Sequence, residues 1–136
     1  MYYVNFLAVL ISAIVSMIIG SIWYGPLFGK AFMQATGLSK LSKKEQELMK
    51  KKMLASYALQ FIASIVMFSV FALLIGINNL TILGGIHMAL LAWIGFAVPL
   101  KLGEALWGGN MTVFWIGIGN MLLTLLAGGI IIGAMA

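Results

Sequence analysis

The fold is decided by the stretch Ser42-Lys43-Lys44-Glu45-Gln46-Glu47-Leu48-Met49-Lys50-Lys51-Lys52, which separates two long apolar runs. It is the densest part of a basic segment, residues 25–52, that contains seven of the eight lysines of the chain. Two glutamates reduce the net charge of this segment to +5. Charged side chains are costly in hydrocarbon, so such a segment lies outside the membrane. It therefore predicts a membrane-spanning helix on each side of it.

The composition agrees with a membrane protein. Of the 136 residues, 63% are hydrophobic and 8% are charged, and the mean hydropathy is +1.13. So few charges cannot cover the surface of a water-soluble domain. The apolar runs are long and continuous, as in helices that cross a hydrocarbon core of roughly 30 Å. The sequence predicts an all-α membrane protein, a single membrane domain over residues 1–136, with four transmembrane helices over about 4–24, 53–76, 81–99 and 111–135.

An amphipathic interfacial helix is predicted between the first and second spans. Gly25-Pro26 is expected to stop the first helix, because the residue before a proline avoids helical geometry. From Leu27 to Thr36 the apolar side chains fall on one side and the polar ones on the other, the pattern of a helix that lies in the interface. Gly37 is expected to end this helix.

A new helix is predicted to begin at Lys43. Ser42 and Glu45 have the spacing of a capping box, in which the serine hydroxyl accepts a bond from a free backbone N–H. We expect this helix to continue into the second span without a break.

Small and polar residues recur every four positions in the first two spans. They are Ala8, Ser12, Ser16 and Gly20 in the first span and Ser56, Gln60 and Ser64 in the second. Such stripes allow close helix packing in lipid, and we expect the two to face each other. In the last span Gly129 and Gly133 form a GxxxG pair, which predicts another close contact.

The lysines predict the orientation. Cytoplasmic loops are enriched in lysine and arginine, so the segment 25–52 is expected to be cytoplasmic and both termini outside. We expect Lys43, Lys44, Lys50, Lys51 and Lys52 to contact anionic lipid headgroups. The chain has no arginine, the preferred reader of phosphates and bases, so the net charge of +5 does not predict a nucleic-acid partner.

The sequence predicts neither an enzyme nor a cofactor or metal site. It contains no cysteine and no aspartate, and no serine lies in a nucleophile-elbow pattern. The polar candidates within the spans are Gln60, His87 and Asn120. They could form the lining or proton relay of a solute pathway. Alternatively, these residues are structural: Gln60 bonds to the first span, and His87 donates to a backbone carbonyl or to Asn120.

The chain resembles the domain of unknown function 1761 family at Asn5, at Ala8 and through residues 20–32. The stretch Trp23-Tyr24-Gly25-Pro26-Leu27-Phe28-Gly29-Lys30 is the specific part of this resemblance, and Gly95-Phe96-Ala97-Val98-Pro99 and Gly109 are also similar. The resemblance implies a small, four-helix integral membrane protein of the kind found mostly in bacteria. It supplies no activity, but it singles out an interfacial motif, Trp23, Tyr24, Pro26, Phe28 and Gly29. Gly108, Asn110, Met111 and Asn120 depart from the family pattern.

Two classes of function follow. In the first, an oligomer forms a small-solute or ion pathway lined by the polar candidates. In the second, the protein is a non-catalytic interaction or scaffold protein whose basic segment binds anionic lipid or a partner subunit. The helices have more small-residue faces than packing within one bundle requires. This predicts a homo-oligomer, a parallel homodimer in the simplest case.

Overall fold

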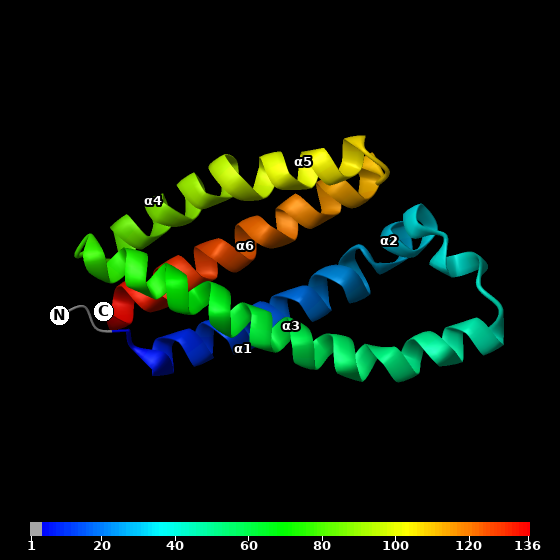
Figure 1. Cartoon of the computed structure of the whole chain (residues 1–136), viewed down its shortest axis with the longest axis horizontal. Coiled ribbons are helices and arrows are strands. Elements are labelled where there is room, and N and C mark those ends of the chain that lie inside the picture. The colour runs from blue at the N-terminus through cyan, green and yellow to red at the C-terminus, as the bar shows by residue number, and fades with distance from the viewer. Residues whose placement is uncertain (1–3) are drawn as a thin grey trace.

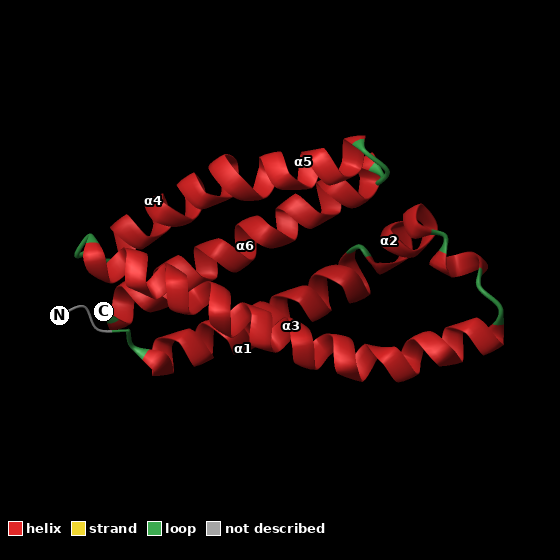
Figure 2. Ribbon diagram, viewed as in Figure 1, coloured by secondary structure: helices red, strands yellow, loops and turns green. Residues whose placement is uncertain are grey.

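The computed structural model describes residues 4–136, and these are helical almost throughout (Figures 1 and 2). Residues 1–3, which the sequence assigns to the membrane domain, lie outside the described part. The elements are α1 (Phe6–Ile22), the π-helical turn η1 (Trp23–Leu27), α2 (Gly29–Thr36), the 3-10 turn η2 (Leu38–Lys40), α3 (Lys43–Ile77), α4 (Ile82–Ala92), the π-helical turn η3 (Trp93–Ala97), α5 (Val98–Leu106) and α6 (Met111–Met135). Within residues 4–136, four segments are long and apolar enough to cross a membrane: Phe6–Leu27, Lys43–Ile77, Ile82–Leu106 and Met111–Met135. The predicted all-α fold, with a short helix between the first two spans, is confirmed.

Helix α6 lies at the centre of the arrangement. It packs against α4 and α5 on one side and against α1 on the other, and α3 packs against α1 (Figure 1). The start of α1 meets the end of α6, where the Asn5 side chain caps α1 and donates to the Met135 carbonyl at 3.0 Å. We call this the terminal end of the bundle. The opposite end, which carries residues 23–52 and the turn at 107–110, is called the basic end.

The terminal end is tightly packed. Its core includes Val9 from α1, Phe68 and Ile75 from α3, Ala89 from α4 and Ile132 from α6. Helices α4 and α6 approach at glycines, since a Cβ on Gly85 would collide with the Gly129 carbonyl, and one on Gly133 would lie 2.6 Å from the Thr81 oxygen. The GxxxG prediction is confirmed, with α4 as the partner helix.

The basic end is open, because α3 diverges from α1 there (Figure 1). The predicted cap is present: the Ser42 hydroxyl accepts from the Glu45 N–H at 3.2 Å, and α3 then runs unbroken for 35 residues. At 1.5 Å per residue this helix is about 52 Å long, so it extends well beyond a hydrocarbon core of roughly 30 Å. Its first half, from Lys43 to Gln60, is exposed.

Two prolines do not end their helices as the sequence predicted. The first helix passes Gly25-Pro26 and continues to Leu27, and the third passes Pro99 and continues to Leu106. A five-residue π-helical turn accompanies each proline: it contains Pro26 in the first case and precedes Pro99 in the second, with Phe28 N–H bonded to Trp23 O and Val98 N–H bonded to Trp93 O. A wider turn relieves the clash that proline makes with the preceding turn. The third helix therefore continues well past Pro99, whereas the first ends one residue after Pro26.

Candidate functional site at the basic end

The interfacial motif forms the corner between α1 and α2. The rings of Trp23 and Phe28 lie 4.7 Å apart between centroids, on either side of the bend. Gly29 permits the sharp turn, because a Cβ there would lie 2.9 Å from the Tyr24 oxygen. Pro26 lies inside the π-helical turn itself. These residues are therefore placed to build a fixed corner.

Two tryptophans anchor this end to α6. The Trp23 indole N–H donates to the Ile116 carbonyl at 2.7 Å, and the Trp93 indole N–H donates to the Ile118 carbonyl at the same distance. The Trp23 ring lies over Gly119, where a Cβ would be 2.6 Å from it. Each tryptophan is the first residue of its π-helical turn. Helix α6 is thus held from α1 and from α4 at nearly the same level.

Trp93 is a site residue that sequence reasoning missed. The signal was present, because both tryptophans stand two residues before a glycine and a few residues before a proline, in Trp23-Tyr24-Gly25-Pro26 and in Trp93-Ile94-Gly95 with Pro99. A pattern this short is weak in the sequence alone. It becomes meaningful only when both indoles are seen on the same helix.

Helix α2 is docked on the bundle by one face. The Phe32 and Tyr24 rings meet edge to face with centroids 5.0 Å apart. The Asn110 amide donates to the Ala35 carbonyl at 3.3 Å and joins the end of α2 to the turn before α6. Lys101 and Glu104 form an exposed ion pair of 3.1 Å near this turn. The outer face of α2, with Lys30, is exposed.

The predicted headgroup lysines all lie on the free part of α3. Lys43, Lys44, Lys50, Lys51 and Lys52 are exposed. Lys50, Lys51 and Lys52 are consecutive, so at 100° per residue they point to three sides of the helix. They form a ring of positive charge at the level where the apolar part of α3 begins.

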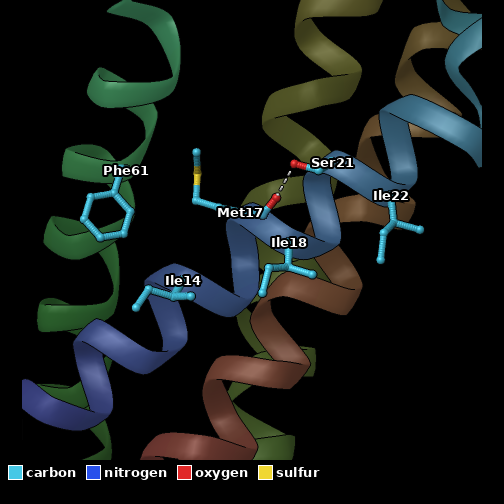
Figure 3. A pocket seen from close by; sticks show the side chains of 6 residues that line it. All are labelled: Ile14, Met17, Ile18, Ser21, Ile22 and Phe61. Carbon is cyan, nitrogen blue, oxygen red and sulfur yellow. Dashed lines mark hydrogen bonds between the residues drawn. The ribbon is translucent and has the colours of Figure 1, made fainter. Parts of the chain in front are cut away.

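An apolar crevice lies between α1 and α3 where the two helices diverge (Figure 3). It has a volume of about 340 Å³ and is lined by Ile14, Met17, Ile18, Ser21 and Ile22 from α1 and by Phe61 from α3. The Met17 side chain points across it toward Phe61, and the Ser21 hydroxyl is occupied by a 2.9 Å bond to the Met17 carbonyl (Figure 3). The crevice is thus apolar on both walls. The sequence did not predict it, because periodicity does not fix the angle at which two helices diverge.

The structure does not bring Gln60, His87 and Asn120 together within one chain. Gln60 and His87 are exposed, on α3 and α4, which diverge from the turn that joins them (Figure 1). Asn120 is half-buried on α6, and its Oδ1 atom has no hydrogen-bond partner among residues 4–136. Their role as a lining stays a prediction.

The two predicted small-residue stripes meet in part. The Ser16 and Ser64 hydroxyls are 3.5 Å apart in the α1–α3 contact, and Ala8 and Ser12 are buried. Gln60 lies outside this contact, because α3 has already begun to leave α1 at that level. The predicted bond from Gln60 to the first span is therefore not formed.

Four apolar segments of spanning length, with charge collected at one end, define an integral membrane protein of the polytopic α-helical class. The chain belongs to the DUF1761 family: the family model described as "Protein of unknown function (DUF1761)" matches residues 7–133. The comparisons with curated proteins and with solved structures gave no match.

Proposed function

We propose that this protein is a non-catalytic membrane protein that binds anionic lipid at its cytoplasmic face through the basic segment 25–52. The observation that supports this most directly is the position of α3. Its first half stands clear of the other helices and carries five exposed lysines. Each lysine near an anionic membrane surface contributes on the order of 1 kcal/mol of attraction.

The rest of the basic end supports the same function. Helix α2 is held by the aromatic corner and by Asn110, so its exposed face with Lys30 stays in a fixed place beside the bundle. Placed in a bacterial cytoplasmic membrane with the termini outside, this face and the lysine ring would meet the inner leaflet. The geometry favours a static surface for headgroups over a reaction centre.

The lipid that surrounds the protein tests this function. Full-length protein is inserted in nanodiscs made from phosphatidylglycerol and phosphatidylcholine, and the enrichment of phosphatidylglycerol around it is measured. We expect enrichment at low salt that falls as salt screens the charges. A variant with glutamine at Lys43, Lys44, Lys50, Lys51 and Lys52 should lose it, whereas the matched arginine variant should keep it. Equal lipid composition around all three proteins would contradict the function.

A homo-oligomer that forms a solute pathway is the second candidate, and the exposed position of Gln60 supports it. An amide that faces lipid is costly unless another helix offers it a hydrogen bond. A second copy that covers this face of α3 would satisfy the amide and would give the polar candidates a shared environment. Solute flux into proteoliposomes that is unchanged in Gln60→Leu, His87→Ala and Asn120→Leu would exclude the pathway.

A further inference from the structure

We infer that the crevice between α1 and α3 is a binding site for one anionic phospholipid, with an acyl chain between the helices and the phosphate at Lys50. The inference rests on the proposed function and adds to it a defined site. Headgroup attraction alone would give a diffuse lipid shell. The structure offers in addition an apolar crevice beside Phe61, on the same face of α3 as Lys50 and about 16 Å from it along the helix.

The first step is the continuity of one face of α3. Lys50, Phe61 and Phe68 are separated by eleven and seven residues, and eighteen residues make five full helical turns. These three side chains therefore lie in line along α3. Phe68 is 0% exposed, Phe61 is half-buried at the crevice, and Lys50 is exposed. The face that enters the core at the terminal end, where Phe68 lies against Gly128 of α6, is thus left uncovered toward the basic end.

The second step is the fit of the crevice to an acyl chain. Its walls are aliphatic, thioether and aromatic side chains, and the one hydroxyl, that of Ser21, is already bonded to a backbone carbonyl. Its volume is about 340 Å³, and it is broadly open on the side away from the helices. A flexible apolar chain fits such walls, and a polar solute does not.

The third step is the distance between the crevice and the charge. Phe61 lies eleven residues from Lys50, about 16 Å along α3. One leaflet of hydrocarbon is roughly 15 Å deep. A phospholipid whose phosphate contacts Lys50 therefore has an acyl chain that reaches the crevice. Tyr57, one turn from Phe61 and 48% exposed, lies between them along α3.

Native mass spectrometry of the full-length protein tests the site, with equal amounts of dioleoylphosphatidylglycerol and dioleoylphosphatidylcholine as the probe lipids. We expect one tightly retained phosphatidylglycerol per chain. Lys50→Gln should weaken its apparent affinity about fivefold. Lys52→Gln is the matched comparison: Lys52 lies on the opposite side of α3 from Phe61, so its loss should weaken the binding of this one lipid less than Lys50→Gln does.

The apolar half of the site is tested by Met17→Trp, which fills the crevice and should remove the bound lipid. Leu91→Trp, at an exposed position of α4, is its control and should retain the lipid. Because the lysine variants are at exposed positions, they keep the test valid even if Met17→Trp does not fold.

The outcomes separate the site from the proposed function. If Lys50→Gln and Lys52→Gln weaken binding equally and Met17→Trp has no effect, the lipid is held by headgroup attraction alone and the site is wrong. If the unmodified protein shows no preference for phosphatidylglycerol, the proposed function fails as well. A lipid-free pair of chains that Met17→Trp separates would assign the crevice to a second copy and overturn the inference.

Discussion

Trp23 and Trp93 each make one hydrogen bond that joins distant parts of the chain. Both indoles donate to carbonyls of α6 at 2.7 Å, and both are half-buried in helices that widen at that residue. In a membrane, hydrophobicity does not drive helices together, so such bonds and close packing determine which helices stay in contact. Near the basic end, where α3 has left the bundle, these two bonds add to the packing of Phe114, Ile116 and Ile118.

Replacing either tryptophan by phenylalanine removes the donor and keeps an aromatic ring. We expect Trp23→Phe and Trp93→Phe each to lower the free energy of unfolding by about 1 kcal/mol, the value of one such bond. Trp107→Phe is the matched control, because Trp107 is 91% exposed and should tolerate the change. Unfolding in a mild detergent by titration with a denaturing detergent measures the difference. Equal stability of all three variants would show that the indole bonds do not hold the basic end.

At the scale of the helices, the α4–α6 contact depends on the absence of side chains. Gly85 and Gly129 lie against each other, so that a Cβ on either would meet the carbonyl of the other. The spacing of Gly129 and Gly133 predicted a close helix contact, but the sequence could not identify Gly85 as the residue they pack against. Spacing along one helix defines a face, whereas the identity of the opposing helix is set by the whole bundle.

We expect Gly85→Ala to destabilise the bundle by about 1–3 kcal/mol, because two backbones must separate to admit the methyl group. Gly103→Ala in α5 is the control: a Cβ there meets nothing within 4 Å, and alanine is the better helix former. It should be neutral, or stabilising by up to about 1 kcal/mol. The same unfolding titration measures both variants. A cost at Gly103 that equals the cost at Gly85 would contradict the close-contact explanation.

At the scale of the molecule, hydropathy and capping signals were sufficient to predict the four apolar helices, the short helix and the start of α3 at Lys43. They failed at Pro26 and Pro99, because a π-helical turn can accommodate a proline and leaves no trace in the apolar pattern. The site was predictable only where chemistry is local, at the aromatic corner and the lysines. The positions of Gln60 and His87 and the crevice depend on where α3 and α1 diverge, which is a property of the assembled bundle.

The predicted dimer can be tested through Gln60, since the chain has no cysteine to interfere with cross-linking. If a second copy covers the Gln60 face of α3 in a parallel dimer, Gln60→Cys chains in native membranes should form a disulfide-linked pair on mild oxidation. Ile62→Cys, about 200° away around the helix and also exposed, should not. Cross-linking at Ile62 alone would place the dimer interface on the Ile62 face of α3, and cross-linking at neither position would favour a monomer.

The orientation is predicted from the uneven charge, and the absence of cysteine allows it to be tested by labelling single introduced cysteines. With segment 25–52 at +5 and the turn at 78–81 uncharged, the positive-inside rule places Ser39 in the cytoplasm and Asn78 and Ala136 outside. A membrane-impermeant maleimide applied to intact cells should label Asn78→Cys and Ala136→Cys at once. It should label Ser39→Cys only after the membrane is opened. The reverse pattern would place the lysine ring and the mouth of the crevice in the outer leaflet, so the lipid they bind would have to be an outer-leaflet lipid. Labelling of all three positions in intact cells would show insertion in both directions, which so strong a charge bias should prevent.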